Sequence, residues 1–460
     1  MTPAETAAPQ PGLANTLRPR HVAMISFGGI IGAGLFVGSA AAIQTGGPGV
    51  FISYGACGLL VFLIMRMLGE MAVARPGHGS FAEYSALSLG PWAGFVTGWL
   101  YWYFWVYTVG AETVAGANLL RDVGVDLPVW LLGGILVTAM TATNLLSVRA
   151  YGELEFWFSL LKVTAIALFI FLGVCFILGF GPSMRDSETT LLGHNGLLPN
   201  GVGGLLGTVP LIIFSMMGSE VATIAAAESG EPAENVARAA RTVALRILVF
   251  YVLSILVIVT IVPWDSVTIG HSPFALVLEH MGFGWAGRAM TVIIITAVLS
   301  CLNSGLYITS RMLYELGRSG HAPKRLASTA RNRVPSLGIL IGCVAGYVAA
   351  LAEIALPDQV FAFLAGTSGD IILVVYMIIA LAEIRMRRKL EAEGAPIPLR
   401  MWFFPWLSYA VVAGNLGVLV LMGFLPDQRL TLLLSGGSVA VVFAALLLHR
   451  RGPRALAAVP

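Results

Sequence analysis

Long apolar segments recur along almost the whole chain. A helix that crosses the hydrocarbon core of a bilayer needs about 20 apolar residues, and twelve segments of the sequence reach this length. They cover approximately residues 21–43, 48–71, 93–121, 128–147, 155–179, 204–227, 240–263, 287–316, 334–353, 360–382, 403–424 and 430–449. Only 11% of the residues are charged, less than half of the share of about 25% that soluble domains carry. The sequence therefore predicts an all-α membrane protein with twelve transmembrane helices.

The positions of Lys and Arg predict the orientation of these helices. Cytoplasmic loops of membrane proteins carry an excess of both residues. If both termini are cytoplasmic, the outer loops contain only Arg121, Arg185, Arg288 and Arg429, and the strongly basic loops after the eighth and tenth segments lie inside. We therefore expect both termini in the cytoplasm, with the basic loops next to anionic lipid rather than bound to nucleic acid.

Glycine interrupts the first apolar segment. Four of the eleven residues from Ser26 to Phe36 are glycines, although each glycine costs a helix about 1 kcal/mol relative to alanine. An interrupted helix is tolerated inside a membrane only where its freed backbone groups face protein, water or a ligand. The stretch is therefore either a tight packing face between helices or a break that exposes backbone amides to a small anionic group.

The sixth segment contains a similar interruption, from Phe214 to Glu220. Two interrupted helices that lie five apart are typical of transporters built from two inverted repeats of five helices, with the substrate site where the breaks meet. The second interruption thus favours a functional break in the first segment. The expected domains are a tail at 1–20, a ten-helix core at 21–382 with repeats at about 21–179 and 204–382, helices eleven and twelve at 403–449, and a tail at 450–460.

Four ionisable residues fall within apolar segments, where such residues are costly and mark functional sites by default. Lys162 either extends its ammonium group to the cytoplasmic interface or is buried and gains and loses a proton. Glu112 either pairs with a substrate amine or bonds to a neighbouring helix. Glu220 either holds the unwound backbone of the sixth segment or binds substrate or protons. Asp370 either shapes the site or caps a helix locally.

Other polar and aromatic residues have a structural and a functional interpretation. Ser300 and Asn303 lie about one helical turn apart in the eighth segment, where they either join membrane helices or contribute to the site. The aromatic residues of 99–105 either pack between helices or line a substrate path. Glu70 and Glu155 lie near the ends of their segments and are expected at the membrane interface.

Several other functions are disfavoured. The sequence contains no His-Glu-x-x-His or Gly-x-Ser-x-Gly motif, so we do not expect an enzyme. The four cysteines lie in apolar segments and are expected to be small buried residues rather than disulfides or metal ligands. The polar N-terminus lacks the pattern of a cleaved signal peptide.

Particular strings resemble a known transporter superfamily. Gly29-Ile-Ile-Gly-Ala-Gly-Leu-Phe36 resembles the first-helix signature of the amino acid–polyamine–organocation superfamily, and the stretch 214–220 resembles its sixth helix. The segment 227–239 is similar to the cytoplasmic segment that follows this helix. The strings at 64–71 and 300–307 are most similar to those of bacterial amino acid permeases, especially the γ-aminobutyrate permeases. The resemblance spans essentially the whole chain.

This resemblance implies a mode of substrate binding. The substrate carboxylate is expected on backbone amides of the first helix and its ammonium group on carbonyls of the sixth, with Phe214 as a gate. Lys162 matches a lysine that replaces a sodium ion in proton-coupled members, and the family implies neither a metal nor an organic cofactor. The expected substrate-binding residues are Gly29, Ile30, Gly32, Ala33, Gly34, Phe214, Ser215, Met217, Gly218, Glu112, Glu220, Ser300 and Asn303.

The expected function is proton-coupled import of an amino acid, by alternating access, across the bacterial cytoplasmic membrane. A small ω-amino acid such as γ-aminobutyrate fits the resemblance best. The alternatives are a permease for proline, aromatic or neutral amino acids, an exchanger, and a sensor that binds an amino acid without moving it. Asp370 departs from the small apolar residue of the γ-aminobutyrate permeases and leaves the exact substrate open, as the sequence also leaves the oligomeric state.

Overall fold

The computed structural model describes residues 31–75, 80–146, 148–180, 190–193, 196–218, 220, 234, 238, 243–330, 334–357 and 359–451. Every regular element in these ranges is helical, and they contain no strand. The all-α class expected from the sequence is therefore confirmed for the described part of the chain.

The helices follow one another with short connections. The first half of the chain contains α2 (Ala33–Phe36), α3 (Gly38–Gly46), α4 (Val50–Ala74), α5 (Phe81–Leu89), α6 (Pro91–Asp122), α7 (Val129–Leu146), α8 (Val148–Ile177), α9 (Thr190–Gly193), α10 (Gly201–Gly207) and α11 (Val209–Met216). The second half contains the π-helix η2 (Ile247–Leu253), then α14 (Ser254–Ile261), α15 (Pro273–His280), α16 (Gly284–Arg318), α17 (Ser336–Ala352), α18 (Val360–Ala392), α19 (Trp406–Met422) and α20 (Arg429–Arg451). Three short 3₁₀ turns complete it, η3 (Trp264–Ser266), η4 (Lys324–Ala327) and η5 (Pro426–Gln428).

Six helical stretches of the described chain are long and apolar enough to cross a membrane. They are Val50–Ala74, Phe156–Ile177, Val243–Ile261, Gly284–Arg318, Val360–Ala392 and Pro426–His449. They coincide with the second, fifth, seventh, eighth, tenth and twelfth apolar segments marked on the sequence. α6 has 32 residues, but its many glycines, aromatic rings and ionisable groups lower its mean hydropathy, so it is absent from this set.

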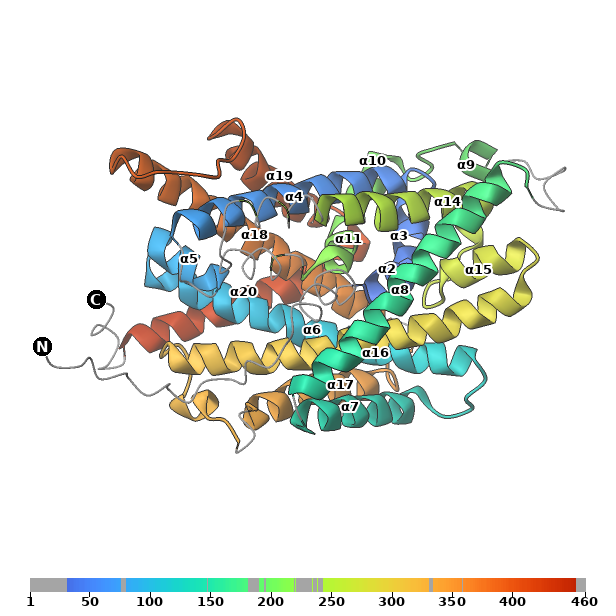
Figure 1. Cartoon of the computed structure of the whole chain (residues 1–460), viewed down its shortest axis with the longest axis horizontal. Coiled ribbons are helices and arrows are strands. Elements are labelled where there is room, and N and C mark those ends of the chain that lie inside the picture. The colour runs from blue at the N-terminus through green and yellow to red at the C-terminus, as the bar shows by residue number, and fades with distance from the viewer. Residues whose placement is uncertain are drawn as a thin grey trace, which may run out of the picture.

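The long helices run along the same axis and enclose the short ones. In Figure 1, α4, α6, α16, α18 and α20 extend across the view, while α2, α3 and α11 lie in the middle of the molecule. α18 is the most enclosed of the six apolar helices, with 78% of its apolar window buried, against 28% for the stretch that contains α20. The fold therefore places two short, interrupted segments at its centre and a late helix at its edge.

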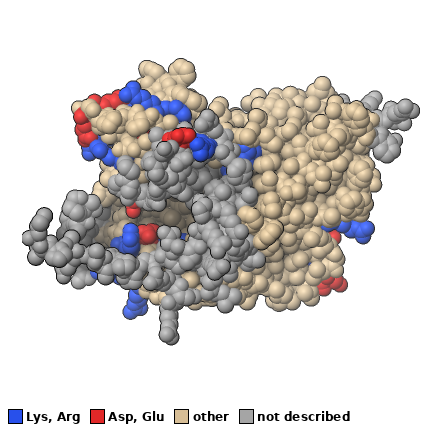
Figure 2. Space-filling view, viewed as in Figure 1, with Lys and Arg blue, Asp and Glu red and all other residues tan. Residues whose placement is uncertain are grey.

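Charged side chains are confined to the two ends of this long axis. Figure 2 shows Lys, Arg, Asp and Glu at the left end and at the lower right, with a broad uncharged face between them. A membrane-spanning bundle requires this distribution, because a charge at the bilayer centre is costly.

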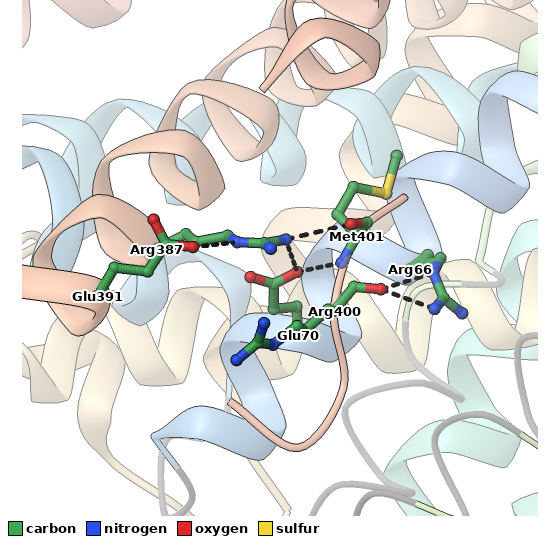
Figure 3. A network of polar contacts seen from close by, with 6 residues as sticks. All are labelled: Arg66, Glu70, Arg387, Glu391, Arg400 and Met401. Carbon is green, nitrogen blue, oxygen red and sulfur yellow. Dashed lines mark hydrogen bonds and ion pairs between the residues drawn. The ribbon is translucent and has the colours of Figure 1, made fainter. Parts of the chain in front are cut away.

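A buried ion pair ties α4 to the segment between α18 and α19. The carboxylate of Glu70 accepts a hydrogen bond from the backbone amide of Met401 and lies 3.3 Å from the Arg387 guanidinium, which also donates to the Met401 carbonyl at 3.1 Å (Figure 3). The expectation that Glu70 lies at the interface is wrong: it is 2% exposed, because residues 393–405 fold back over it. The side chain of Glu155 lies outside the described residues.

The four cysteines are free thiols, as expected. Cys57, Cys301 and Cys343 are buried, whereas Cys175 is partly exposed. Cys301 is the one that bears on function, because it lies beside the interrupted first segment.

Candidate substrate-binding site

The first interruption is a real break in the helix. Gly32 has an extended backbone (φ −130°, ψ −151°), and α2 begins only at Ala33. The amide of Ala33 donates to both carboxylate oxygens of Glu112, at 3.0 Å each. The first amides of a helix have no partner within the helix, and a carboxylate makes a strong, charge-assisted bond to such a group. Gly29 and Ile30 lie outside the described residues.

Glycine is required here because the break is tightly packed. A Cβ on Gly32 would overlap Oε1 of Glu112 and lie 2.7 Å from the Cβ of Cys301. A Cβ on Gly34 would lie 2.7 Å from the Cα of Ser215. The glycine-rich stretch is therefore both a break, at Gly32, and a packing face, at Gly34. The sequence presented these two interpretations as alternatives.

The second interruption follows α11. Met217 has an extended backbone (φ −68°, ψ 159°), and Gly218 has a φ of +93°, which residues with a side chain rarely adopt. The Gly218 amide donates to both carboxylate oxygens of Glu220, at 3.2 and 3.1 Å. Tyr101 of α6 donates its hydroxyl to the same carboxylate at 2.6 Å. In this structure Glu220 thus holds the unwound backbone, which is the structural role foreseen for it.

The two breaks meet in the interior, as the packing of Gly34 against Ser215 shows. The carbonyl of Ser215 accepts a hydrogen bond of 2.7 Å from the hydroxyl of Tyr251. The hydroxyl of Tyr376 lies 2.9 Å from the sulfur of Met217. Phe214 is buried, with its ring centroid 6.4 Å from that of Phe104. Each backbone position expected to face substrate is therefore surrounded by side chains of the surrounding helices.

Lys162 lies next to this pair of breaks. Its side chain is fully buried, and its ammonium group donates to the hydroxyl of Ser300 at 2.8 Å. The ammonium group therefore does not extend to the membrane interface in this structure. Because Ser300 precedes Cys301, which packs against Gly32, α16 connects the lysine to the first break. The same lysine attracts the carboxylate of Glu112 electrostatically.

Asn303 and Asp370 contact helices away from the breaks. The side-chain oxygen of Asn303 accepts hydrogen bonds from Asn144 at 2.7 Å and from Thr143 at 3.1 Å, which joins α16 to α7. Asp370 accepts a hydrogen bond of 3.1 Å from Ser435, which joins α18 to α20. The structure thus brings Ser300 to Lys162 but directs Asn303, one turn later, toward another helix.

Three tyrosines complete the site, and sequence reasoning missed the role of all three. Tyr101 belonged to an aromatic run with two open interpretations, while Tyr251 and Tyr376 were not identified at all. A phenol in an apolar segment carries a hydroxyl that requires a partner once it is buried. This requirement was the available signal, but it does not indicate which partner the hydroxyl finds.

Comparisons with known proteins agree with this arrangement. Residues 21–449 match the family model described as amino acid permease. The chain is 45% identical to the γ-aminobutyric acid permease of Bacillus subtilis, over 96% of this chain and 95% of the relative. It is 44% identical to the γ-aminobutyric acid permease of Escherichia coli, over 92% of this chain and 91% of the relative.

A solved structure extends the likeness to the fold. A mutant of the manganese transporter of Eremococcus coleocola superposes with a TM-score of 0.59 over 94% of this chain and 93% of that chain, at 14% sequence identity. At this identity the likeness concerns the fold alone. The family model and the relatives cover nearly the whole chain, and the protein therefore belongs to the amino acid permease family, a family of membrane transporters rather than enzymes.

Proposed function

We propose that this chain imports γ-aminobutyrate, or a similar small ω-amino acid, together with protons by alternating access. One observation carries the proposal: the Ala33 amide in the first break is bound by a carboxylate, that of Glu112, directly beside the second break. A site that already accepts one carboxylate has the chemistry to accept that of a substrate. Two relatives at 44–45% identity are named γ-aminobutyric acid permeases, which supports this choice of substrate.

Substrate binding then requires an exchange of carboxylates. The substrate carboxylate displaces Glu112 from the Ala33 amide, and the released Glu112 becomes a partner for the substrate ammonium group. The carbonyl of Ser215 supplies a second acceptor, because a carbonyl oxygen has two lone pairs and Tyr251 occupies one of them. The separated charges of an ω-amino acid suit a site whose acceptors lie on different helices.

Lys162 is the proposed coupling residue. A buried ammonium group readily loses its proton, and here it links α8 to α16 through Ser300. Loss of the proton would weaken both this link and the attraction between Lys162 and Glu112. Protonation at one end of the site is thereby connected to the carboxylate exchange at the other. The proton gradient is the proposed driving force, without a metal or an organic cofactor.

The proposed architecture is the twelve-helix arrangement expected from the sequence. The first repeat covers about 21–179 and the second about 204–382, with two further helices at 403–449 and cytoplasmic tails at 1–20 and 450–460. The contact between the two breaks supports this arrangement, because inverted repeats bring their interrupted helices together at the substrate site. The membrane is the bacterial cytoplasmic membrane, with both termini inside.

Uptake into proteoliposomes tests the function directly. We expect γ-aminobutyrate to accumulate when an inward proton gradient is imposed, and unlabelled γ-aminobutyrate and β-alanine to compete better than proline or phenylalanine. Uptake that ignores the proton gradient but follows sodium, or that requires amino acid on the opposite side, would refute proton symport. Stronger competition by proline or phenylalanine would refute the choice of an ω-amino acid.

A further inference from the structure

A second cavity lies outside the helix breaks, between α5, α6 and α16. Its volume is about 400 Å³, enough for a small amino acid and several waters. Charged groups of both signs line it, namely Arg311, Glu83 and Glu315, beside the rings of Phe81, Tyr101 and Tyr307. Figure 2 shows the molecule hollowed at the end where α5 lies, with basic and acidic side chains inside the hollow.

One residue connects this cavity to the second break. Tyr101 lines the cavity and donates its hydroxyl to Glu220, the carboxylate that holds the Gly218 amide. The ring of Phe81 packs edge-on against that of Tyr101, with centroids 4.6 Å apart. The cavity and the breaks are thus separated by a wall that includes the side chain of Tyr101.

The positive charge of the cavity is held in a fixed position. The guanidinium of Arg311 lies 3.2 Å from the ring centroid of Tyr307, and its Nη1 donates to the Tyr307 carbonyl at 3.1 Å. Guanidinium groups stack on aromatic rings and present five N–H donors in a rigid fork that matches a carboxylate. Arg311 is therefore oriented in advance for a carboxylate in the cavity.

The negative charges of the cavity lie about one helical turn away. Glu315 follows Arg311 by four residues on α16, a rise of about 6 Å, and residues at this spacing share a helix face. Glu83 of α5 lies close enough to repel Glu315 electrostatically, so a cation between them is favoured. The exposed Arg318, 3.2 Å from Glu315, partly fulfils this role. The cavity thus separates one positive group from two negative ones, the complement of a zwitterion.

We propose that this cavity is a second amino acid site, which the substrate occupies between the helix breaks and the cytoplasm. The substrate carboxylate pairs with Arg311 and its ammonium group with Glu315 and Glu83. The proposal rests on the proposed function for its class of substrate and for the cytoplasmic location of this end. Binding is weaker than at the breaks, because Arg311 and Glu315 are partly exposed and solvent screens exposed charge pairs.

Equilibrium binding of radiolabelled γ-aminobutyrate to the full-length protein in lipid nanodiscs tests this proposal. We expect a tight and a weak component in the wild-type isotherm. Arg311→Gln and Glu315→Gln should each weaken the weak component by at least about tenfold, since a hydrogen bond to a charged group is lost. The tight component should be unchanged, which also shows that each variant is folded. Arg325→Gln, an exposed residue outside the cavity, is the matched control and should leave both components unchanged.

The opposite variant completes the test. Gly32→Ala should remove the tight component and leave the weak one, because it disturbs only the first break. A wild-type isotherm with one component, or a weak component that neither Arg311→Gln nor Glu315→Gln alters, would refute the second site. Parallel isotherms with β-alanine and proline separate this failure from that of the proposed substrate. If no zwitterion of the three shows a component sensitive to Arg311→Gln, the second site is refuted whatever the uptake assays show.

Discussion

The two helix breaks are held by carboxylates of very different origin. The amide of Ala33 is bound by Glu112, which lies 79 residues further along the chain, on α6. The amide of Gly218 is bound by Glu220, only two residues away. A local acid can keep its break formed when helices move relative to one another. A remote acid ties its break to the position of another helix, and its bond is lost when that helix shifts.

This difference assigns the two breaks different roles in transport. The second break has its own acid and is supported by Tyr101 and Tyr251, so it is the more rigid half of the site. The first break exposes an amide whose only described side-chain partner can be exchanged for a substrate carboxylate. The predictions below test whether the first break is the exchangeable half and the second the rigid half.

The largest effect is expected from Gly32→Ala. The added methyl group would overlap Glu112 and Cys301 and displace the Ala33 amide, and misplacement of a reacting group by about 1 Å can cost about 100-fold in rate. We expect γ-aminobutyrate uptake in proteoliposomes to fall by at least this factor. Gly38→Ala is the matched control, because its Cβ would meet its nearest neighbours, Leu211 and Phe361, at an ordinary 3.6 Å. Equal uptake by the two variants would show that the first break is not the site.

The next effect is expected from Lys162→Ala. Without the ammonium group that links α8 to α16, proton-driven accumulation should be lost while exchange of internal for external γ-aminobutyrate continues. The measurement is the ratio of internal to external substrate under an imposed proton gradient. Ser300→Ala removes the hydroxyl but keeps the ammonium group, and should lower this ratio without abolishing it. If Lys162→Ala still concentrates substrate, the coupling role is wrong.

A third prediction separates the two carboxylates by stability. Each buried donor left without a partner costs about 1–3 kcal/mol, so Glu112→Ala and Glu220→Ala should both lower the apparent melting temperature of the purified protein. Butyrate, which has a carboxylate but no ammonium group, should restore part of the loss in Glu112→Ala by binding the Ala33 amide. It should have no effect on Glu220→Ala. Equal rescue of both variants would contradict the distinction between the breaks.

The smallest effect is expected from Tyr251→Phe. The hydroxyl that this change removes donates to the Ser215 carbonyl, which is the proposed acceptor for the substrate ammonium group. A hydrogen bond of this kind contributes about 1 kcal/mol, so the KM for uptake should fall about fivefold as the carbonyl is no longer shared. Tyr376→Phe, whose hydroxyl contacts the sulfur of Met217 instead, should leave KM unchanged. A higher KM in Tyr251→Phe would place the ammonium group elsewhere.

The sequence alone determined the helical class, the membrane setting and the positions of both breaks. These properties follow from local composition: the length of an apolar segment, a cluster of glycines and an ionisable residue within a span can each be identified within about 20 residues. The resemblance to amino acid permeases rested on equally local strings, and the family model over residues 21–449 confirms it.

Only the tertiary structure decided which groups meet. Glu112 and Ala33 are 79 residues apart, and Lys162 and Ser300 are 138 apart, so their contacts depend on how whole helices pack. The same packing buried Glu70 under the segment 393–405 and separated Asn303 from Ser300. A buried polar group requires a partner, and the sequence shows this requirement, but the choice among distant partners is made by the packing of the bundle.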